Sequence, residues 1–169
     1  MVWMHKLLLL SDRHAFRVRF SIPILAFALL NGLSLGGAEL AVVVNKANTL
    51  ETISSADLRL MILGEKTKWP DGKKVSPVQT PPESPEGAML LKVVFKMSDA
   101  VLKRYYMQAA FTGKDIVPPA DVRSAAALKQ FVARTPGAIG CILASDVDAT
   151  VTVLKVDGAA PGEAGYKLH

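Results

Sequence analysis

The sequence predicts a single α/β domain built on a mixed sheet that helices cover on both faces. Apolar runs rich in β-branched residues, such as residues 40–44 and 138–143, are typical of buried strands. Between the runs lie segments with helical spacing, each introduced by a serine that can cap a helix. The resulting order is β-α-β-α-α-α-β-β. Strands that are apolar throughout and alternate with helices need cover on both faces of their sheet.

The first 38 residues are predicted to form a cleavable signal peptide. Four basic residues precede an apolar run at residues 22–35, and small residues then lead to Ala38, which is the order of a secretory signal. Cleavage after Ala38 would make Glu39 the first residue of a domain spanning 39–169. The alternative is an uncleaved membrane anchor, but the run is shorter than the ~20 apolar residues that a span needs. We therefore expect an exported, periplasmic protein.

The positive charge of the chain belongs mainly to this signal. The full chain carries 20 Lys+Arg against 15 Asp+Glu, a net charge of +5. The signal holds four basic residues and one acidic residue, which leaves +2 for the predicted domain. Because the remaining charges are interspersed and form no basic stripe, we expect no nucleic-acid partner.

Two strands and a helix are expected in the first part of the domain. The strand at residues 40–44 leads through a polar loop to a helix that begins at Ser54 or Ser55 and ends at Gly64. A short strand follows at residues 75–78.

Three further helices and two strands complete the domain. Ser84 starts the second helix, with proline and glutamate in the first helical positions. Ser98 and Ser124 start the third and fourth helices. Strands at residues 138–143 and 151–156 follow, and the Gly- and Pro-containing tail beyond them is expected to be loosely held.

Residues that could carry catalysis are scarce in the predicted domain. Two of the three histidines belong to the signal, and His169 lies in the tail. The single cysteine, Cys141, lies in an apolar run and is expected to be a small core residue. Asp146 and Asp148 lack further oxygen ligands at regular spacing, so a solvated turn is expected there rather than a metal site. We expect no enzyme activity, no cofactor and no metal.

Two polar features remain as candidate binding sites, each with a structural alternative. Ser84 begins a helix after a short strand, where free N–H groups and the positive dipole end can hold an anion. Alternatively it only caps its own helix, an interpretation that the neighbouring Glu83 and Glu86 favour. Trp69 could stack on a ligand, but anchoring a loop in the core is the preferred interpretation.

Several segments resemble the phosphate-binding proteins of ABC transporters. These segments are residues 41–45, Gly64-Glu65-Lys66, Trp69-Pro70-Asp71-Gly72 and Thr135-Pro136-Gly137-Ala138-Ile139-Gly140. The chain thus looks like a short, stand-alone member of the type II periplasmic binding protein-like superfamily, with a single lobe. The resemblance implies an anion-binding site formed by Thr80, Ser84, Gly87, Asn48 and Thr49. Thr80 stands where these proteins carry an arginine clamp, so the resemblance implies weak binding.

Two functions are expected from this combination. The first is a periplasmic binding domain that holds phosphate or another small anion weakly, through loops at residues 45–49, 80–87 and 135–137, with an ABC permease as partner. The alternative is an accessory protein-interaction module of an envelope complex, without a role in small-molecule transport. A homodimer is a further option, because two lobes could rebuild a cleft that one lobe lacks.

Overall fold

The computed structural model describes residues 37–169. The predicted signal peptide, residues 1–38, lies outside the described residues except for Gly37 and Ala38, and its cleavage stays a prediction. No helix in the described part combines the length and the hydropathy that crossing a bilayer requires.

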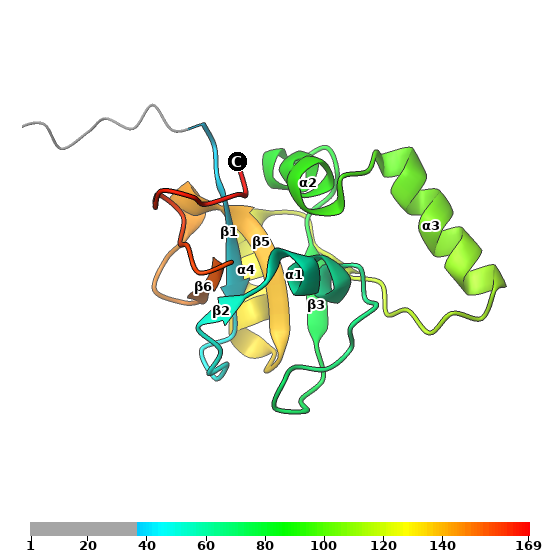
Figure 1. The fold of residues 1–169 in the computed structure, drawn as a ribbon, viewed down its shortest axis with the longest axis horizontal. Coiled ribbons are helices and arrows are strands. Elements are labelled where there is room, and N and C mark those ends of the chain that lie inside the picture. The colour runs from blue at the N-terminus through cyan, green and yellow to red at the C-terminus, as the bar shows by residue number, and fades with distance from the viewer. Residues whose placement is uncertain (1–36) are drawn as a thin grey trace, which may run out of the picture. The chain divides into compact units, whose positions relative to one another are not determined.

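In this part of the chain, a six-stranded mixed sheet forms the centre of the fold (Figure 1). The strands are β1 (Leu40–Val44), β2 (Thr52–Ile53), β3 (Ser76–Gln79), β4 (Ala120–Asp121), β5 (Ala138–Leu143) and β6 (Thr152–Val156). Their order across the sheet is β2-β6-β1-β5-β3-β4. The predicted mixed sheet is confirmed. The sequence does not indicate β2 and β4, because two residues are too few to show a periodicity.

The strand directions give the sheet two different ends. β1 is antiparallel to both of its neighbours, β5 and β6. The β2–β6, β3–β5 and β3–β4 pairs are parallel. All strands except β1 therefore finish at the same end of the sheet, here named the carboxyl end, and β1 finishes at the opposite, amino end.

The described residues form four α-helices, each capped by a serine as the sequence predicts. They are α1 (Ser55–Ile62), α2 (Pro85–Met89), α3 (Asp99–Phe111) and α4 (Ala125–Arg134). The side chains of Ser54, Ser84, Ser98 and Ser124 each accept a hydrogen bond from the backbone N–H three residues ahead. α2 continues directly as a π-helix, η1 (Leu90–Phe95), and a 3-10 turn, η2 (Ala144–Asp146), follows β5.

Helices cover both faces of the sheet, as predicted. Alternate residues of β1 point to opposite faces: Val42 packs with the cluster that includes α1 and η1, whereas Val43 packs with Leu128 and Val132 of α4. This two-sided burial explains why β1 is a continuous apolar run.

The C-terminal tail is not loosely held, which corrects the expectation from its composition. Tyr166 and Leu168 are both buried in the core cluster of the α1 face. The Tyr166 hydroxyl donates to the carbonyl oxygen of Leu40, and the Leu40 N–H donates to Leu168 O at 2.8 Å. The tail therefore pairs with the beginning of β1, because two apolar side chains outweigh the flexibility of its glycines.

Candidate functional site

The five predicted anion-binding residues fall at two ends of the sheet. Thr80 follows β3 at the carboxyl end, and Ser84 and Gly87 lie in the turn and helix directly after it. Asn48 and Thr49 follow β1, which ends at the amino end. The structure thus brings together Thr80, Ser84 and Gly87, and separates them from Asn48 and Thr49.

The segment Thr80–Gly87 forms a compact polar turn. The Thr80 side chain is buried at 3 % exposure, and its Oγ1 lies 2.9 Å from Ser84 Oγ. Ser84 Oγ accepts the Gly87 N–H at 3.0 Å and also lies 2.9 Å from Pro81 O. Gly87 is required by the closeness of this turn, since an added Cβ would come within 2.0 Å of Pro81 O. Two hydroxyls and one backbone N–H therefore converge beyond the end of β3.

The charges around this turn are mainly acidic. Glu83 is exposed, whereas Glu86 is buried in the first turn of α2. Lys103 of α3 is close enough to interact with Glu83: Asp99, four residues before Lys103, chiefly raises the pKa of the lysine, and the charge of Glu83 raises that pKa further. Because the carboxylates complement the positive end of α2, an arriving anion meets repulsion as well as hydrogen-bond donors.

At the amino end of the sheet, the predicted loops are fixed by their own hydrogen bonds. Asn45 Nδ2 donates to Val132 O and Ala133 O at 2.7 and 2.9 Å. Asn48 Oδ1 accepts the Leu50 N–H at 2.8 Å, while Thr49 is exposed. These asparagine side chains therefore shape the loop after β1.

Trp69 anchors its loop, which confirms the preferred interpretation from the sequence. Its ring is buried, and Nε1 donates to Gly137 O at 2.9 Å. The same carbonyl accepts the Ser76 N–H at 3.0 Å, so the tryptophan joins the loop before β3 to the turn before β5. Gly137 itself adopts a φ of +83°, and a Cβ there would lie 2.2 Å from Lys74 O.

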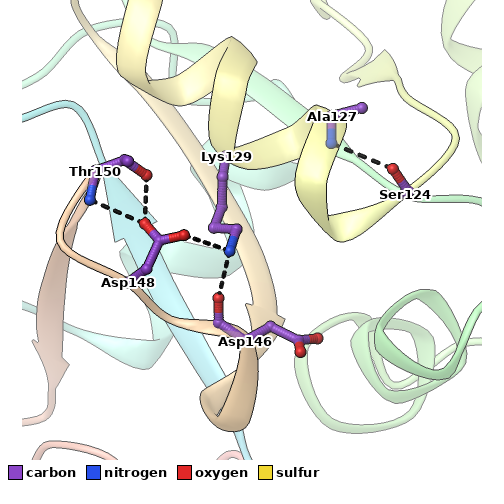
Figure 2. A network of polar contacts seen from close by, with 6 residues as sticks. All are labelled: Ser124, Ala127, Lys129, Asp146, Asp148 and Thr150. Atoms are coloured by element: carbon purple, nitrogen blue, oxygen red, sulfur yellow. Dashed lines mark hydrogen bonds and ion pairs between the residues drawn. The ribbon is translucent and has the colours of Figure 1, made fainter.

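Cys141 and Asp148 both have structural roles. Cys141 is buried in β5, and this burial raises the pKa of its thiol to about 12. Asp148 is not merely solvated: its carboxylate accepts from Lys129 Nζ at 2.6 Å and from the backbone and hydroxyl of Thr150 (Figure 2). Lys129 also donates to the backbone oxygen of Asp146 at 2.7 Å, which fastens the loop after η2 to α4. Among residues 37–169 no group of three His, Cys, Asp or Glu side chains could hold a metal ion.

One cationic cavity is not predicted by the sequence. A cavity of about 260 Å³ is lined by Arg59 of α1, Lys96 after η1 and Lys167 of the tail. These residues come from three distant segments and belong to no local motif. Only the packing of α1, η1 and the tail against one another brings them together.

Comparison with known proteins supports the fold and leaves the family open at the level of sequence. No family model and no curated protein sequence matches the chain. Among solved structures, an ABC-type phosphate transport receptor from Vibrio cholerae matches with a TM-score of 0.62 and 21 % identity, covering 78 % of this chain and 53 % of the receptor.

Two other solved structures match the chain over a similar part of its length. PstS from Borrelia burgdorferi has a TM-score of 0.58 and 14 % identity, over 73 % of this chain and 49 % of its own. A phosphate-binding protein from Stenotrophomonas maltophilia has a TM-score of 0.56 and 18 % identity, over 76 % and 41 %. The chain thus spans about half the length of the solved structures that it matches. Residues 37–169 have a mixed α/β fold that resembles about half of each of these phosphate-binding receptors, and this likeness is one of structure alone.

Proposed function

We propose that the chain is a periplasmic binding-protein-like domain that holds phosphate or another small oxyanion weakly at the turn Thr80–Gly87. The observation that carries this proposal is the convergence of the Thr80 and Ser84 hydroxyls with the Gly87 N–H beyond the carboxyl end of β3. In open α/β sheets, ligands bind outside the carboxyl ends of the strands. The solved structures with this fold include a phosphate transport receptor and a phosphate-binding protein, which supports a non-enzymatic role and an oxyanion as the ligand.

Weak binding follows from the partners that the turn already has. A hydroxyl has one proton, and Ser84 shares its Oγ between Thr80, Pro81 O and the Gly87 N–H. An anion must therefore replace an existing hydrogen bond, and such an exchange yields a modest net free energy. Glu83 and Glu86 add negative charge close by.

Calorimetric titration of the purified chain with phosphate and sulfate tests the site when combined with a matched pair of variants. Ser84→Ala and Ser124→Ala each remove the same kind of helix cap, at a cost of about 1 kcal/mol in stability. Only Ser84→Ala is expected to abolish the heat of phosphate binding. Equal loss in both variants, or no heat from the unmodified chain at millimolar phosphate, would contradict the proposal.

Removing negative charge gives a second, opposite test of the same site. Glu83→Gln keeps the size of an exposed side chain and removes one repelling carboxylate. Phosphate affinity is expected to rise by about threefold, which corresponds to a modest surface electrostatic effect. The gain should shrink at high salt, because screening weakens exposed charges. An unchanged affinity would place the anion elsewhere.

The second candidate function is an interaction module, which the surface of α3 favours. Figure 1 shows α3 at one side of the domain, joined by a loop at each end. The large apolar side chains that are exposed among residues 37–169 all lie on this helix: Val101 at 48 %, Met107 at 60 % and Phe111 at 90 %. Met107 and Phe111 are four residues apart and share a face with the exposed Arg104. This combination suits an envelope protein, such as a permease, that presents an apolar surface with an acidic rim.

Crosslinking in intact cells can test the α3 surface. A photoreactive residue at position 107 should capture a second protein, and Phe111→Ser should abolish that capture. Ser84→Ala should leave it unchanged, which separates the interaction role from anion binding. A crosslinked homodimer would replace the envelope partner by a second copy of this chain, and no crosslink would remove this candidate function.

A further inference from the structure

The cationic cavity lies between the start of α1, the end of η1 and the C-terminal tail. It shares no residue with the turn Thr80–Gly87, so a ligand bound there is independent of the proposed function. None of the described residues that line it is acidic, whereas Arg59, Lys96 and Lys167 all carry positive charge. Its remaining wall is largely apolar, with Leu58, Val93, Val94 and Leu168.

Arg59 has hydrogen-bonding capacity to spare in this position. Its Nε donates to Phe95 O at 3.3 Å, which holds the half-buried side chain beside the end of η1. No ion pair of Arg59 occurs among the described residues. The hydrogen bond from Tyr105 chiefly lowers the pKa of the Glu65 carboxyl, and the charge of Arg59 adds only a minor contribution. The guanidinium can therefore offer its outer N–H groups to a ligand.

Lys96 stands next to Arg59 in an unusual backbone conformation. It follows Phe95, the residue whose carbonyl Arg59 contacts, and has a φ of +54°. This left-handed region disfavours residues with a side chain, and glycine is the usual choice at such a helix end. The Lys96 ammonium is exposed and forms no ion pair within the described part of the chain. A lysine at a position suited to glycine is consistent with a use for its charge.

The third cation, Lys167, already has an acidic partner, which limits the negative charge that a ligand of this cavity can carry. Lys167 Nζ pairs with Asp157 Oδ2 at 2.8 Å, and Asp157 Oδ1 accepts the Ser55 N–H at 2.9 Å. The start of α1 thus has its own carboxylate. Two cations, Arg59 and Lys96, remain to hold one anionic group.

We propose that this cavity binds a small organic anion, namely a carboxylate attached to a short apolar group. The carboxylate would lie between Arg59 and Lys96, which would both donate charge-assisted hydrogen bonds to it. Such bonds are stronger than those between neutral groups. The apolar group would lie on Leu58 and Val94, which favours a ligand with a carbon chain over a bare inorganic ion.

The test is an NMR titration of the purified chain with three probes: hexanoate, hexan-1-ol and inorganic phosphate. Hexanoate is expected to shift the backbone amides of Ser55, Arg59 and Lys96 in a saturable way, with a Kd on the order of 1 mM. Hexan-1-ol lacks the charge and phosphate lacks the carbon chain, so both should bind this cavity several-fold more weakly.

Two lysine variants, one within η1 and one just after it, make the titration specific. Lys96→Gly removes the charge at a position whose backbone suits glycine, so the fold should be retained while hexanoate affinity falls about five- to tenfold. Lys92→Gln removes an exposed charge of η1 that does not line the cavity, and should leave the affinity unchanged. Equal binding of hexan-1-ol or phosphate, no saturable shift, or full affinity in Lys96→Gly would each overturn the proposal.

Discussion

At the residue scale, carboxylates of this chain hold loops and termini together. Asp148 fastens the loop after η2 to Lys129 of α4. Glu65 accepts a 2.6 Å hydrogen bond from Tyr105 and pairs with Lys114 at 3.2 Å, which ties α3 to the loop after α1. Each of these carboxylates therefore joins segments that are distant in the sequence.

Lys129 offers a direct measure of one such contact (Figure 2). Lys129→Met keeps most of the side-chain stem and removes the hydrogen bonds to Asp146 O and the Asp148 carboxylate. The side chain is only 19 % exposed, so the free energy of unfolding should fall by about 1 kcal/mol. Urea denaturation measures the change, and Lys155→Met, at an exposed position of β6 without an ion pair among the described residues, is the matched control. Equal effects of the two variants would contradict the assigned role.

Asp157 makes the stability of the fold depend on pH in the acidic range. Hydrogen bonds from Lys167 and from the Ser55 N–H lower the pKa of its carboxyl from 3.8 to about 2. A lowered pKa stabilises the folded state above pH 3.8, and this contribution is lost as the pH falls from about 4 towards 2.

Asp157→Asn should flatten that part of the pH profile of stability. Asparagine tolerates the left-handed backbone at this position, where φ is +51°, so the comparison isolates the charge. Lys167→Met should flatten the same limb, because it removes the cation that depresses the pKa. Urea denaturation at a series of pH values measures both, and an unaltered slope in the two variants would refute the assignment.

At the element scale, the loop that leads from α3 back to the sheet packs against Gly64. Gly64 O accepts the Val117 N–H at 3.1 Å, and a Cβ on Gly64 would fall 1.9 Å from Val117 O. Gly64 also has a φ of +78°. Gly64, just after α1, is therefore also a place where the loop between α3 and β4 packs directly against the backbone that follows α1.

Gly64→Ala and Gly72→Ala separate these two demands on glycine. Gly72 has a similar φ of +84°, but nothing lies within 4 Å of a Cβ placed there. Gly72→Ala should cost about 1 kcal/mol of stability from backbone strain alone. Gly64→Ala should cost about 2 kcal/mol more, since the loop at Val117 must also move. Thermal unfolding of the two variants measures the difference, and equal costs would deny the close approach.

Features with local causes are those that the sequence predicts well at this scale. A serine before a helical pattern satisfies a free N–H, so Ser84, Ser98 and Ser124 indicate the beginnings of α2, α3 and α4 correctly. A strand buried on both faces must be apolar throughout, which identifies β1 and β5.

At the scale of the whole molecule, strand direction and long-range packing decide what local patterns leave open. The family resemblance groups Asn48 and Thr49 with Ser84. Because β1 is antiparallel to β5, however, Asn48 and Thr49 lie at the other end of the sheet. The tail is rich in glycine, yet Tyr166 bonds to a residue 126 positions earlier. Arg59 and Lys96 share a cavity because distant segments pack together in the same way. None of these pairings has a signal within one stretch of sequence.

We propose two separate ligand-binding regions within this domain, and amide chemical shifts test their separation directly. The purified chain is titrated with phosphate and, separately, with hexanoate. We expect phosphate to shift the amides of Ser84 and Gly87, and hexanoate to shift those of Ser55 and Lys96. The oxyanion site is contradicted if millimolar phosphate leaves the Ser84 and Gly87 amides in place, and the separation is contradicted if both probes move the same residues.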